Sequence, residues 1–357
     1  MTDPLPPGAV IGILGGGQLG RMLSMAAARL GLRCHIFDPG ADAPAGQVAE
    51  TLVTAGYDDA EALHRFAKAV DVITYEFENI PTAALDLLEG LRPIRPGREA
   101  LRISQDRLSE KRYLQELGLN VAPFADTPDL AALRAALENI GTPAILKTRR
   151  FGYDGKGQVR IETVADADGA FAEMNGAPAI LEGFVPFVRE VSVIAARGLD
   201  GQVAAFDPGE NVHRAGILRT TSVPATLPVA QRTDAVLLAG RILNALDYVG
   251  VLGVELFVTP GGLVVNEIAP RVHNSGHWTQ AGCAIDQFEQ HIRAVAGWPL
   301  GDGQRNVDVV MENLIGSDMD RLPDLRGAAN TQIHLYGKAE TRDGRKMGHV
   351  NRISPKT

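Results

Sequence analysis

The sequence predicts a mixed α/β protein of two or three domains, and three observations support that prediction. The chain has 357 residues, which is more than one compact domain usually contains. Its first part alternates buried-strand and helix patterns, as in a doubly wound parallel sheet. From about Asn306 onward, the pattern is that of a small β-rich domain.

The N-terminal part carries a glycine-rich turn between its first strand and its first helix. The strand and helix patterns run over 9–14, 21–30, 33–37 and 70–75. Gly15-Gly-Gly-Gln-Leu-Gly20 and the later Asp38 match the fingerprint of dinucleotide-binding folds, so an NAD-dependent dehydrogenase is one interpretation. Because such a turn presents backbone N–H groups to any anion, a sugar phosphate is another.

Helix and strand patterns alternate through the middle of the chain. Helices are expected over 105–117, from a Thr127-Pro128 cap to Gly141, and over 227–246. Strands are expected over 144–148, 178–185 and 189–195, and a bend at Pro186 joins the last two.

Two segments in this region indicate a ligand site. Tyr75-Glu-Phe-Glu-Asn79 follows a strand, at the sheet edge where ligands bind in open α/β folds. Lys147 ends a strand and precedes the glycine-rich segment 149–158, whose backbone donors could close over phosphates. This segment is not a Walker A loop. A solvated loop, an edge lysine and a plain glycine-rich hairpin are the structural alternatives.

The strands over 178–195 contain an apolar pair flanked by acids. Phe184-Val185 beside Glu182 and Glu190 suits a purine and its ribose, although an ordinary sheet edge explains the same pattern. His213 lies in an expected loop between strands, where a lone histidine is usually structural.

Thr259-Pro-Gly-Gly262 between two runs rich in Val, Leu and Ile predicts a β-hairpin. If residues 260–262 form the loop, Glu255 and Glu267 lie opposite one another on the same face. Adjacent carboxylates repel unless a cation lies between them. Their oxygens, with the Asn266 amide nearby, suit Mg²⁺ shared with nucleotide phosphates. A register shifted by one residue would instead bury one acid and expose the other.

Two later segments are also rich in polar residues. Arg271-Val-His-Asn-Ser-Gly-His277 follows the hairpin directly, and such dense polar clusters at a strand end usually have a function. In the tail, Asp343-Gly344 predicts a type I′ hairpin in which Lys338 and Arg345 share one face and Lys346 points away unless a bulge intervenes. Two cations on one face suit a phosphomonoester, and a solvated surface is the alternative.

Composition excludes several classes of protein. The formal net charge is −8 and no long basic run is present, which argues against a nucleic-acid partner. Neither a signal-peptide pattern nor an apolar run of membrane-spanning length is found, so no membrane partner is expected. Cys34 and Cys283 fit no metal or disulfide spacing, which favours the cytoplasm.

The order of these motifs resembles the ATP-grasp superfamily, in which the nucleotide lies between two α+β lobes. The resemblance is closer still to the family of N5-carboxyaminoimidazole ribonucleotide synthases and covers essentially the whole chain. The motifs that carry it lie at 15–20, 75–79, 151–157, 266–277 and 344–349. It implies a Rossmann-like domain over 1–103, an ATP-grasp domain over 104–303 with a mobile lobe at about 123–185, and a small β-rich domain over 304–357.

The resemblance also implies ligands, a homodimer and the residues of each site. ATP would be bound by Arg107, Lys147, Gly152, Tyr153, Asp154, Gly155, Lys156, Gly157, Gln158, Glu182, Gly183, Phe184, Val185, Glu190, His213, Asn266 and Glu267. Mg²⁺ or Mn²⁺ would be bound by Glu255 and Glu267. The ribonucleotide would be contacted by Gln18, Leu19, Glu76, Asn274, Ser275, Lys338, Arg345 and Lys346. As catalytic groups, Arg271 and His273 would hold bicarbonate, while Tyr153 or Asp154 would manage the proton of the amine.

The implied reaction has two stages and belongs to purine synthesis. Bicarbonate attacks the γ-phosphorus of ATP, giving carboxyphosphate and ADP. The exocyclic amine of 5-aminoimidazole ribonucleotide is then carboxylated by carboxyphosphate or by CO₂ released from it. Three alternatives stay open: a formate-dependent glycinamide ribonucleotide transformylase of the same superfamily, an NAD-dependent dehydrogenase, and a nucleotide-binding regulator without catalysis. The segments 151–154 and 274–277 disfavour the first.

Overall fold

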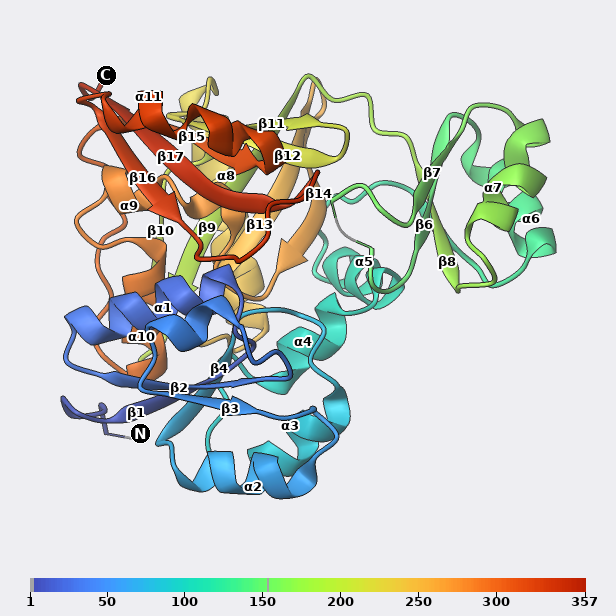
Figure 1. Ribbon diagram of the computed structural model, residues 1–357. Coiled ribbons are helices and arrows are strands. Elements are labelled where there is room, and N and C mark those ends of the chain that lie inside the picture. The colour runs from blue at the N-terminus through green and yellow to red at the C-terminus, as the bar shows by residue number, and fades with distance from the viewer. Residues whose placement is uncertain (1–2, 153) are drawn as a thin grey trace.

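The N-terminal part is a parallel sheet with helices on both faces, as predicted (Figure 1). The computed structural model describes residues 3–152 and 154–357, so the predicted site residue Tyr153 lies outside the described residues. The strand order is β3-β2-β1-β4, with β1 (Val10–Leu14), β2 (Arg33–Asp38), β3 (Thr51–Thr54) and β4 (Val72–Tyr75). The accompanying helices are α1 (Gln18–Arg29), η1 (Pro44–Gln47), α2 (Ala60–Lys68) and α3 (Thr82–Glu89). Strand β1 is entirely buried because both faces of the sheet are covered.

Two helices connect this sheet to a projecting lobe. They are α4 (Arg98–Ser104) and α5 (Arg107–Glu116), and Asp106 caps α5 by accepting hydrogen bonds from the backbone of Leu108 and Ser109. Helix α6 (Leu130–Ile140) starts at Asp129, whose side chain accepts from Ala132 N at 2.8 Å. The predicted Thr127-Pro128 cap is therefore wrong, because the Asp129 carboxylate satisfies the first-turn donor of this helix.

The lobe is a small antiparallel sheet with two helices and a core of its own. The strand order is β5-β8-β6-β7, with β5 (Phe124–Thr127), β6 (Ala144–Thr148), β7 (Gln158–Ile161) and β8 (Ala179–Gly183). The helical elements are α6, η2 (Val164–Asp166) and α7 (Ala167–Glu173). Leu133, Leu146 and Leu181 are fully buried in this core. The lobe stands apart from the rest of the molecule at the right of Figure 1, with segment 184–188 leading from β8 back to the body.

A sheet of nine described strands forms the centre of the body. Its order is β14-β13-β9-β11-β12-β15-β17-β16, and β10 pairs with β9. The strands are β9 (Arg189–Arg197), β10 (Val203–Ala205), β11 (Gly209–Arg214), β12 (Ile217–Val223), β13 (Gly250–Thr259), β14 (Gly262–Ala269), β15 (Asp308–Ile315), β16 (Thr331–Leu335) and β17 (Lys346–Ser354). The helical elements are α8 (Val229–Ala245), η3 (Asn274–Gly276), α9 (Thr279–Gly282), α10 (Gln287–Ala296), η4 (Gly316–Arg321) and α11 (Leu322–Arg326). The tail is β-rich as predicted, but it extends the central sheet, because β12 pairs with β15.

The tail hairpin differs from the prediction. Strands β16 and β17 pair Leu335 with Gly348, so a loop over 336–345 separates them. Asp343 and Gly344 form a turn inside this loop, where Arg345 N donates to Arg342 O at 3.0 Å, but they do not connect the two strands directly. At the start of this loop Tyr336 is buried, and its hydroxyl lies 2.8 Å from His349 Nδ1. The register that was expected to place Lys338 and Arg345 on one strand face is therefore wrong.

Within the two described ranges, no helix combines the length and the apolar character that a bilayer span requires.

We predict that Asn351→Ala lowers the free energy of unfolding by about 1–3 kcal/mol. Asn351 on β17 is fully buried, and its Nδ2 donates to His277 O at 3.0 Å. The substitution leaves that carbonyl without this donor. Urea unfolding measures the change, and Asn330→Ala at an exposed position should alter stability by less than about 0.5 kcal/mol. Equal effects of the two variants would contradict the prediction.

Candidate active site

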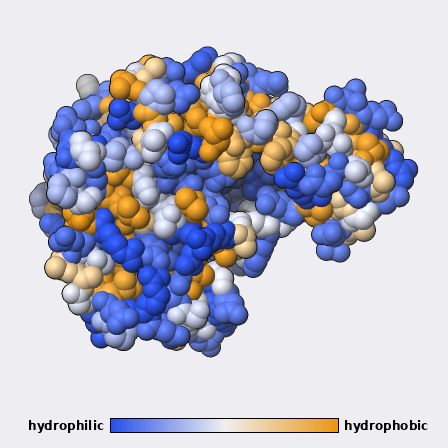
Figure 2. Space-filling view, turned by 90° about the horizontal axis from the view of Figure 1, so that it is seen from above, coloured by the Kyte–Doolittle hydropathy of each residue, from blue (hydrophilic) through white to orange (hydrophobic). Residues whose placement is uncertain are grey.

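A cavity of about 630 Å³ is lined by residues of the lobe, the body and the N-terminal part. Figure 2 shows the surface hollowed between the lobe and the body. The predicted residues that line the cavity are Gln18, Leu19, Glu76, Arg107, Lys147, Gly152, Asp154, Gly155, Lys156, Gln158, Glu182, Gly183, Phe184, Val185, Glu190, His213, Glu255, Asn266, Glu267, Arg271, His273, Asn274 and Lys346. Of the predicted residues that the structure describes, four are not among the lining residues: Gly157, Ser275, Lys338 and Arg345. The structure thus brings most of the predicted site together.

The β13–β14 hairpin pairs Glu255 with Glu267, as the sequence predicted. The loop length and the bulge that produce this register were not predicted. Thr259 pairs with Gly262, so the loop is one residue shorter than expected, and a bulge at Asn266 restores the expected register. Without that bulge, Glu255 would face Asn266, and the two carboxylates would not be paired.

The electrostatics of this carboxylate pair favour a cation. Burial and the nearby Glu267 raise the pKa of Glu255 to about 7. Burial would also raise the pKa of Glu267, but the Arg107 guanidinium, 2.9 Å away, lowers it to about 2. Asn266 Oδ1 is buried without a hydrogen-bond partner. Two carboxylates and this amide oxygen are hard oxygen ligands that fit Mg²⁺. No group of three or more His, Cys, Asp and Glu side chains suited to a metal exists within 3–152 and 154–357.

Helix α5 holds the bulged strand through three side chains. Arg107 pairs with Glu267, Lys111 Nζ donates to Asn266 O at 2.6 Å, and Glu110 Oε1 accepts from Ile268 N at 2.5 Å. Burial, followed by repulsion from Glu267, raises the pKa of Glu110 to about 8. Lys111 and Glu110 were not predicted as site residues. A charged residue at an interior helix position is the available signal, but it does not identify the partner strand.

Two lysines neutralise a buried acid at the junction of lobe and body. Glu182 Oε2 lies 3.0 Å from Lys147 Nζ on β6 and 3.3 Å from Lys111 Nζ on α5. Burial would raise the pKa of Glu182, but the two ammonium groups lower it to about 2. Burial lowers the pKa of Lys147. Glu182 Oε1 is buried without a hydrogen-bond partner, so this cluster keeps polar capacity for a ligand.

The glycine-rich segment contacts the body at two points. Asp154 Oδ1 accepts from Lys346 Nζ of β17 at 2.7 Å. Gly155 lies against Gly216 in the β11–β12 turn, where an added Cβ on Gly216 would be 2.5 Å from Gly155 Cα. Both glycines have positive φ values of 78° and 77°. Small residues at both points therefore allow backbone to lie directly on backbone.

The end of the cavity near the lobe junction has aromatic walls. Phe187 stacks on Phe257 of β13 with ring centroids 4.7 Å apart and an interplanar angle of 11°. Both rings line the cavity with the predicted Phe184 and Val185. Phe187 and Phe257 were missed from the sequence, because their contact joins the linker after β8 to a distant strand. Such a surface accepts a planar base.

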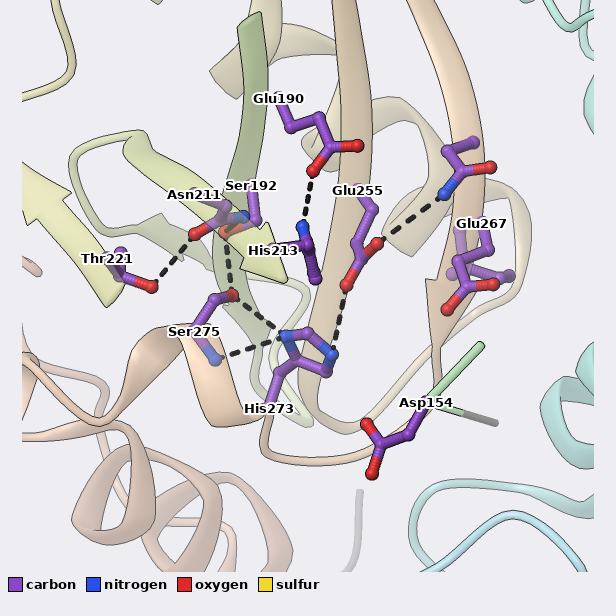
Figure 3. A network of polar contacts seen from close by, with 12 residues as sticks. Asp154, Glu190, Ser192, Asn211, His213, Thr221, Glu255, Glu267, His273 and Ser275 are labelled. Atoms are coloured by element: carbon purple, nitrogen blue, oxygen red, sulfur yellow. Dashed lines mark hydrogen bonds and ion pairs between the residues drawn. The ribbon is translucent and has the colours of Figure 1, made fainter. Parts of the chain in front are cut away.

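His213 forms an ion pair with Glu190 across neighbouring strands β11 and β9 (Figure 3). Burial alone would lower the pKa of His213, but the Glu190 carboxylate raises it. Both side chains line the cavity. With Nδ1 bonded to Glu190, the other ring nitrogen, Nε2, is the one available to a ligand in the cavity.

Arg271 and His273 lie beyond the carboxylate pair. Arg271 Nε and Nη2 bind both oxygens of Glu78, at 2.5 and 3.1 Å. His273 Nε2 lies 3.4 Å from Glu255 Oε1, and burial lowers its pKa to about 3. Glu78 lies in the motif at 75–79 but was not predicted as a site residue. An arginine fixed by one carboxylate keeps further N–H donors for an anion.

The glycine-rich turn after β1 is occupied by the protein's own carboxylates. Gly17 N and Gly20 N donate to Glu76 at 2.5 and 2.7 Å, and Gly16 N donates to Asp38 at 2.7 Å. Burial raises the pKa of Glu76 despite these bonds. The donors that would bind a dinucleotide pyrophosphate are therefore engaged, which contradicts the dehydrogenase alternative.

The cations of the tail lie near the part of the cavity that Glu76 lines. Lys346 lines the cavity, and Lys338 Nζ donates to Lys346 O at 2.7 Å. Burial, with Arg345 and Lys346 nearby, lowers the pKa of Lys338 to about 8. Asn274 also lines the cavity, and its Oδ1 and Nδ2 are both buried without a partner. Lys338 and Arg345 thus lie beside Lys346 and do not line the cavity themselves.

We predict that Lys111→Met lowers the free energy of unfolding by about 3 kcal/mol. The Lys111 side chain is 1% exposed, and the substitution removes a cation from Glu182 and a donor from Asn266 O. Urea unfolding measures the loss, and ATP titration should show weakened binding because the bulge loses its support. Lys68→Met, an exposed site at the end of α2, is the matched control. Similar stability of the two variants would refute this role.

Three family models match the chain. The ribonucleotide synthetase preATP-grasp domain matches residues 9–105, the ATP-grasp domain matches 112–288, and the phosphoribosylaminoimidazole carboxylase C-terminal domain matches 309–357. Together these matches cover the N-terminal sheet, the lobe with the central sheet, and the tail.

Relatives and solved structures are similar over nearly the whole chain. The N5-carboxyaminoimidazole ribonucleotide synthase of Brucella melitensis is 57% identical over 356 residues, covering 99% of this chain and 98% of that relative. An ADP complex of an N5-carboxyaminoimidazole ribonucleotide synthetase has a TM-score of 0.96 at 41% identity, covering 99% and 94% of the two chains. The Aspergillus clavatus synthase in complex with ADP and 5-aminoimidazole ribonucleotide has a TM-score of 0.92 at 31% identity, covering 98% and 95%.

Proposed function

The chain belongs to the N5-carboxyaminoimidazole ribonucleotide synthase family, and from this premise we propose how its cavity carries out the reaction. The chain is an ATP-grasp ligase of purine biosynthesis. It uses ATP and bicarbonate to carboxylate the exocyclic amine of 5-aminoimidazole ribonucleotide, through carboxyphosphate, to N5-carboxyaminoimidazole ribonucleotide.

One observation supports the assignment of residues. Glu267, Arg271, His273 and Asn274 follow one another on the chain and line one continuous cavity. Glu267 pairs with Arg107, and His273, which contacts Glu255, leads along the chain to Asn274. A reaction that transfers a group from ATP to a phosphorylated acceptor needs such an arrangement, because both substrates must meet without leaving the site.

In the first stage, the side chains of the body and the lobe bind ATP. The base lies against Phe184 and Phe257, and Lys147 with the glycine-rich segment binds phosphate oxygens. Mg²⁺ held by Glu255, Glu267 and Asn266 would neutralise phosphate charge when bound. Arg271 orients bicarbonate with the N–H groups that Glu78 does not use. The preorganised cations stabilise the charge that develops on the transferred phosphoryl group.

In the second stage, the ribonucleotide lies against Gln18, Leu19 and Asn274, with Lys346 at its phosphate end. Carboxyphosphate is short-lived in water, so the segment with Asp154 must exclude solvent until the amine has reacted. The salt bridge between Asp154 and Lys346 supports this assignment, because it ties the segment to the acceptor end of the cavity. We assign the amine's proton to the Asp154 carboxylate.

The proposal also includes the cellular compartment and the oligomeric state. We propose that the protein acts in the cytoplasm, which the unpaired thiols of Cys34 and Cys283 support. We propose a homodimer on the family resemblance, and light scattering of the purified chain tests it. A monomer under assay conditions would remove that part alone.

The reaction is tested by ADP release with ATP, Mg²⁺ and bicarbonate, with and without 5-aminoimidazole ribonucleotide. We expect the ribonucleotide to stimulate ADP release and to be converted to the carboxylated product. Formate with glycinamide ribonucleotide should give no product. Absence of stimulation by 5-aminoimidazole ribonucleotide would overturn the assignment.

We predict that Asp154→Asn uncouples ATP use from carboxylation. Loss of the carboxylate removes the ion pair with Lys346, so water reaches carboxyphosphate before the amine does. Product formation should fall about tenfold or more while ADP release exceeds product. Measuring both products in one assay gives the ratio. Asp168→Asn, an exposed acid on the lobe, should keep the ratio at one. An unchanged ratio in Asp154→Asn would remove Asp154 from this role.

We predict that Mg²⁺ binds about tenfold more weakly at pH 6 than at pH 8 in the absence of nucleotide. The pKa of Glu255 is raised to about 7, so its carboxyl is mostly protonated at pH 6 and mostly ionised at pH 8. Metal binding requires the ionised form, so affinity rises with pH and binding releases a proton. Calorimetry in two buffers measures affinity and proton release. Glu255→Gln should bind weakly at both pH values, and a wild-type affinity that is independent of pH would contradict the prediction.

A further inference from the structure

A chain of buried polar side chains leads from strand β12 to the ring of His273 (Figure 3). Thr221 Oγ1 lies 2.8 Å from Asn211 Oδ1, and Asn211 Nδ2 lies 3.0 Å from Ser192 Oγ. Ser192 Oγ lies 2.6 Å from Ser275 Oγ, which lies 2.8 Å from His273 Nδ1. The four residues before His273 are at most 6% exposed. Water therefore does not compete for these bonds.

The backbone identifies which nitrogen of His273 carries the proton. Ser275 N lies 3.4 Å from His273 Nδ1, and this contact caps the short helix η3. A backbone N–H can only donate, so Nδ1 accepts and has no proton. The neutral imidazole then carries its proton on Nε2. Nε2 faces Glu255 Oε1 at 3.4 Å, which is a suitable acceptor.

The side-chain bonds have the same direction as the backbone contact. Asn211 accepts from Thr221 through Oδ1 and donates to Ser192 through Nδ2. Ser192, having accepted one bond, donates its hydroxyl to Ser275. Ser275 in turn donates to His273 Nδ1. Each group thus satisfies the next, and the chain ends on the nitrogen that must accept.

The ring cannot easily turn to exchange its nitrogens. Gln287, which is fully buried, accepts from His273 N at 2.9 Å and donates to His273 O at 2.8 Å. Gly253 lies beneath the side chain, where an added Cβ would be 2.8 Å from His273 Cβ. The main chain is therefore held from one side, and the side chain packs on the strand from the other.

We propose that Thr221, Asn211, Ser192 and Ser275 are positioning residues that fix His273 as the Nε2–H tautomer. In that form, Nε2 donates a hydrogen bond to an anionic oxygen of the carboxyphosphate formed from bicarbonate. His273 does not act as the base. His273 keeps its proton throughout, and no bond to it forms or breaks. This inference rests on the proposed function, because the oxyanion is that of the carboxylation reaction.

The tautomer is measured without catalysis, so its failure is distinct from failure of the proposed function. The full chain is labelled with ¹⁵N in its histidine rings, and His273→Gln identifies the His273 signals. We expect Nε2 to show the shift of a protonated nitrogen and Nδ1 that of an unprotonated one. The opposite assignment, or an equal mixture, would overturn the proposal.

Substitutions along the chain test the positioning role. Asn211→Asp replaces the Nδ2 donor with an acceptor of the same size, and Ser275→Ala removes the last hydroxyl. Both should shift the His273 tautomer population and lower kcat by about 10- to 100-fold, with KM for ATP changed less than about twofold. Ser275→Thr restores the hydroxyl and should recover the tautomer and most of kcat.

Ser222→Ala is the matched control, because it removes a hydroxyl from the residue after Thr221 on β12. Its kcat and its His273 ring shifts should equal those of the wild type. A loss of kcat in Ser275→Ala with an unchanged tautomer would overturn the positioning role. So would an unchanged tautomer in Asn211→Asp.

Discussion

The charge buried where helix α5 meets strand β14 is the constraint on which the site depends. Arg107, Glu110 and Lys111 bind three consecutive positions of the strand, 266–268, through a carboxylate, a backbone N–H and a backbone carbonyl. Charges removed from water must be paired, and a displaced strand would take one partner from each of the three. The pairing therefore fixes the bulge. The bulge in turn keeps Glu267 opposite Glu255, so the carboxylate pair that we propose for Mg²⁺ depends on a helix that carries neither acid.

The same charges connect the lobe to the body. Glu182 on strand β8 is shared by Lys147 of the lobe and Lys111 of the body. A phosphate that attracts Lys147 would leave Glu182 neutralised by Lys111 alone. Binding of a polyanion thus changes the partners of a buried acid without leaving it unpaired, which is the costly outcome. The apolar end, where Phe187 stacks on Phe257, adds a second contact between the linker and the body. The Glu182 ion pairs and the ring stack thus connect the lobe and its linker to the body.

Local patterns predicted most of the elements, and non-local contacts account for the differences. The parallel N-terminal sheet and helix α8 follow from hydrophobic periodicity, which is a property of neighbouring residues. Glu255 and Glu267 were predicted to pair, but through a longer loop and without the bulge that helix α5 stabilises. The predicted register of the tail hairpin is wrong, and the observed arrangement includes the buried contact of Tyr336 with His349, which no turn signal contains. Lys111 was missed because its role depends on the strand that it contacts, which the sequence does not identify. In each of these cases, the outcome depends on which side chains are buried and on which distant residue they contact.

The glycine-rich turn after β1 illustrates why a motif predicts a backbone shape more reliably than a ligand. Its glycines allow the N–H groups at the start of α1 to converge on one point, and that point attracts an anion. Here the anion is the Glu76 carboxylate, which arrives from the end of β4 and accepts from Gly17 and Gly20. A bound phosphate would have to displace a buried acid that itself requires these donors. The residues that remain available to a ligand are the side chains of Gln18 and Leu19, which line the cavity. The turn therefore helps to shape the acceptor end, while the helix terminus is satisfied from within the protein.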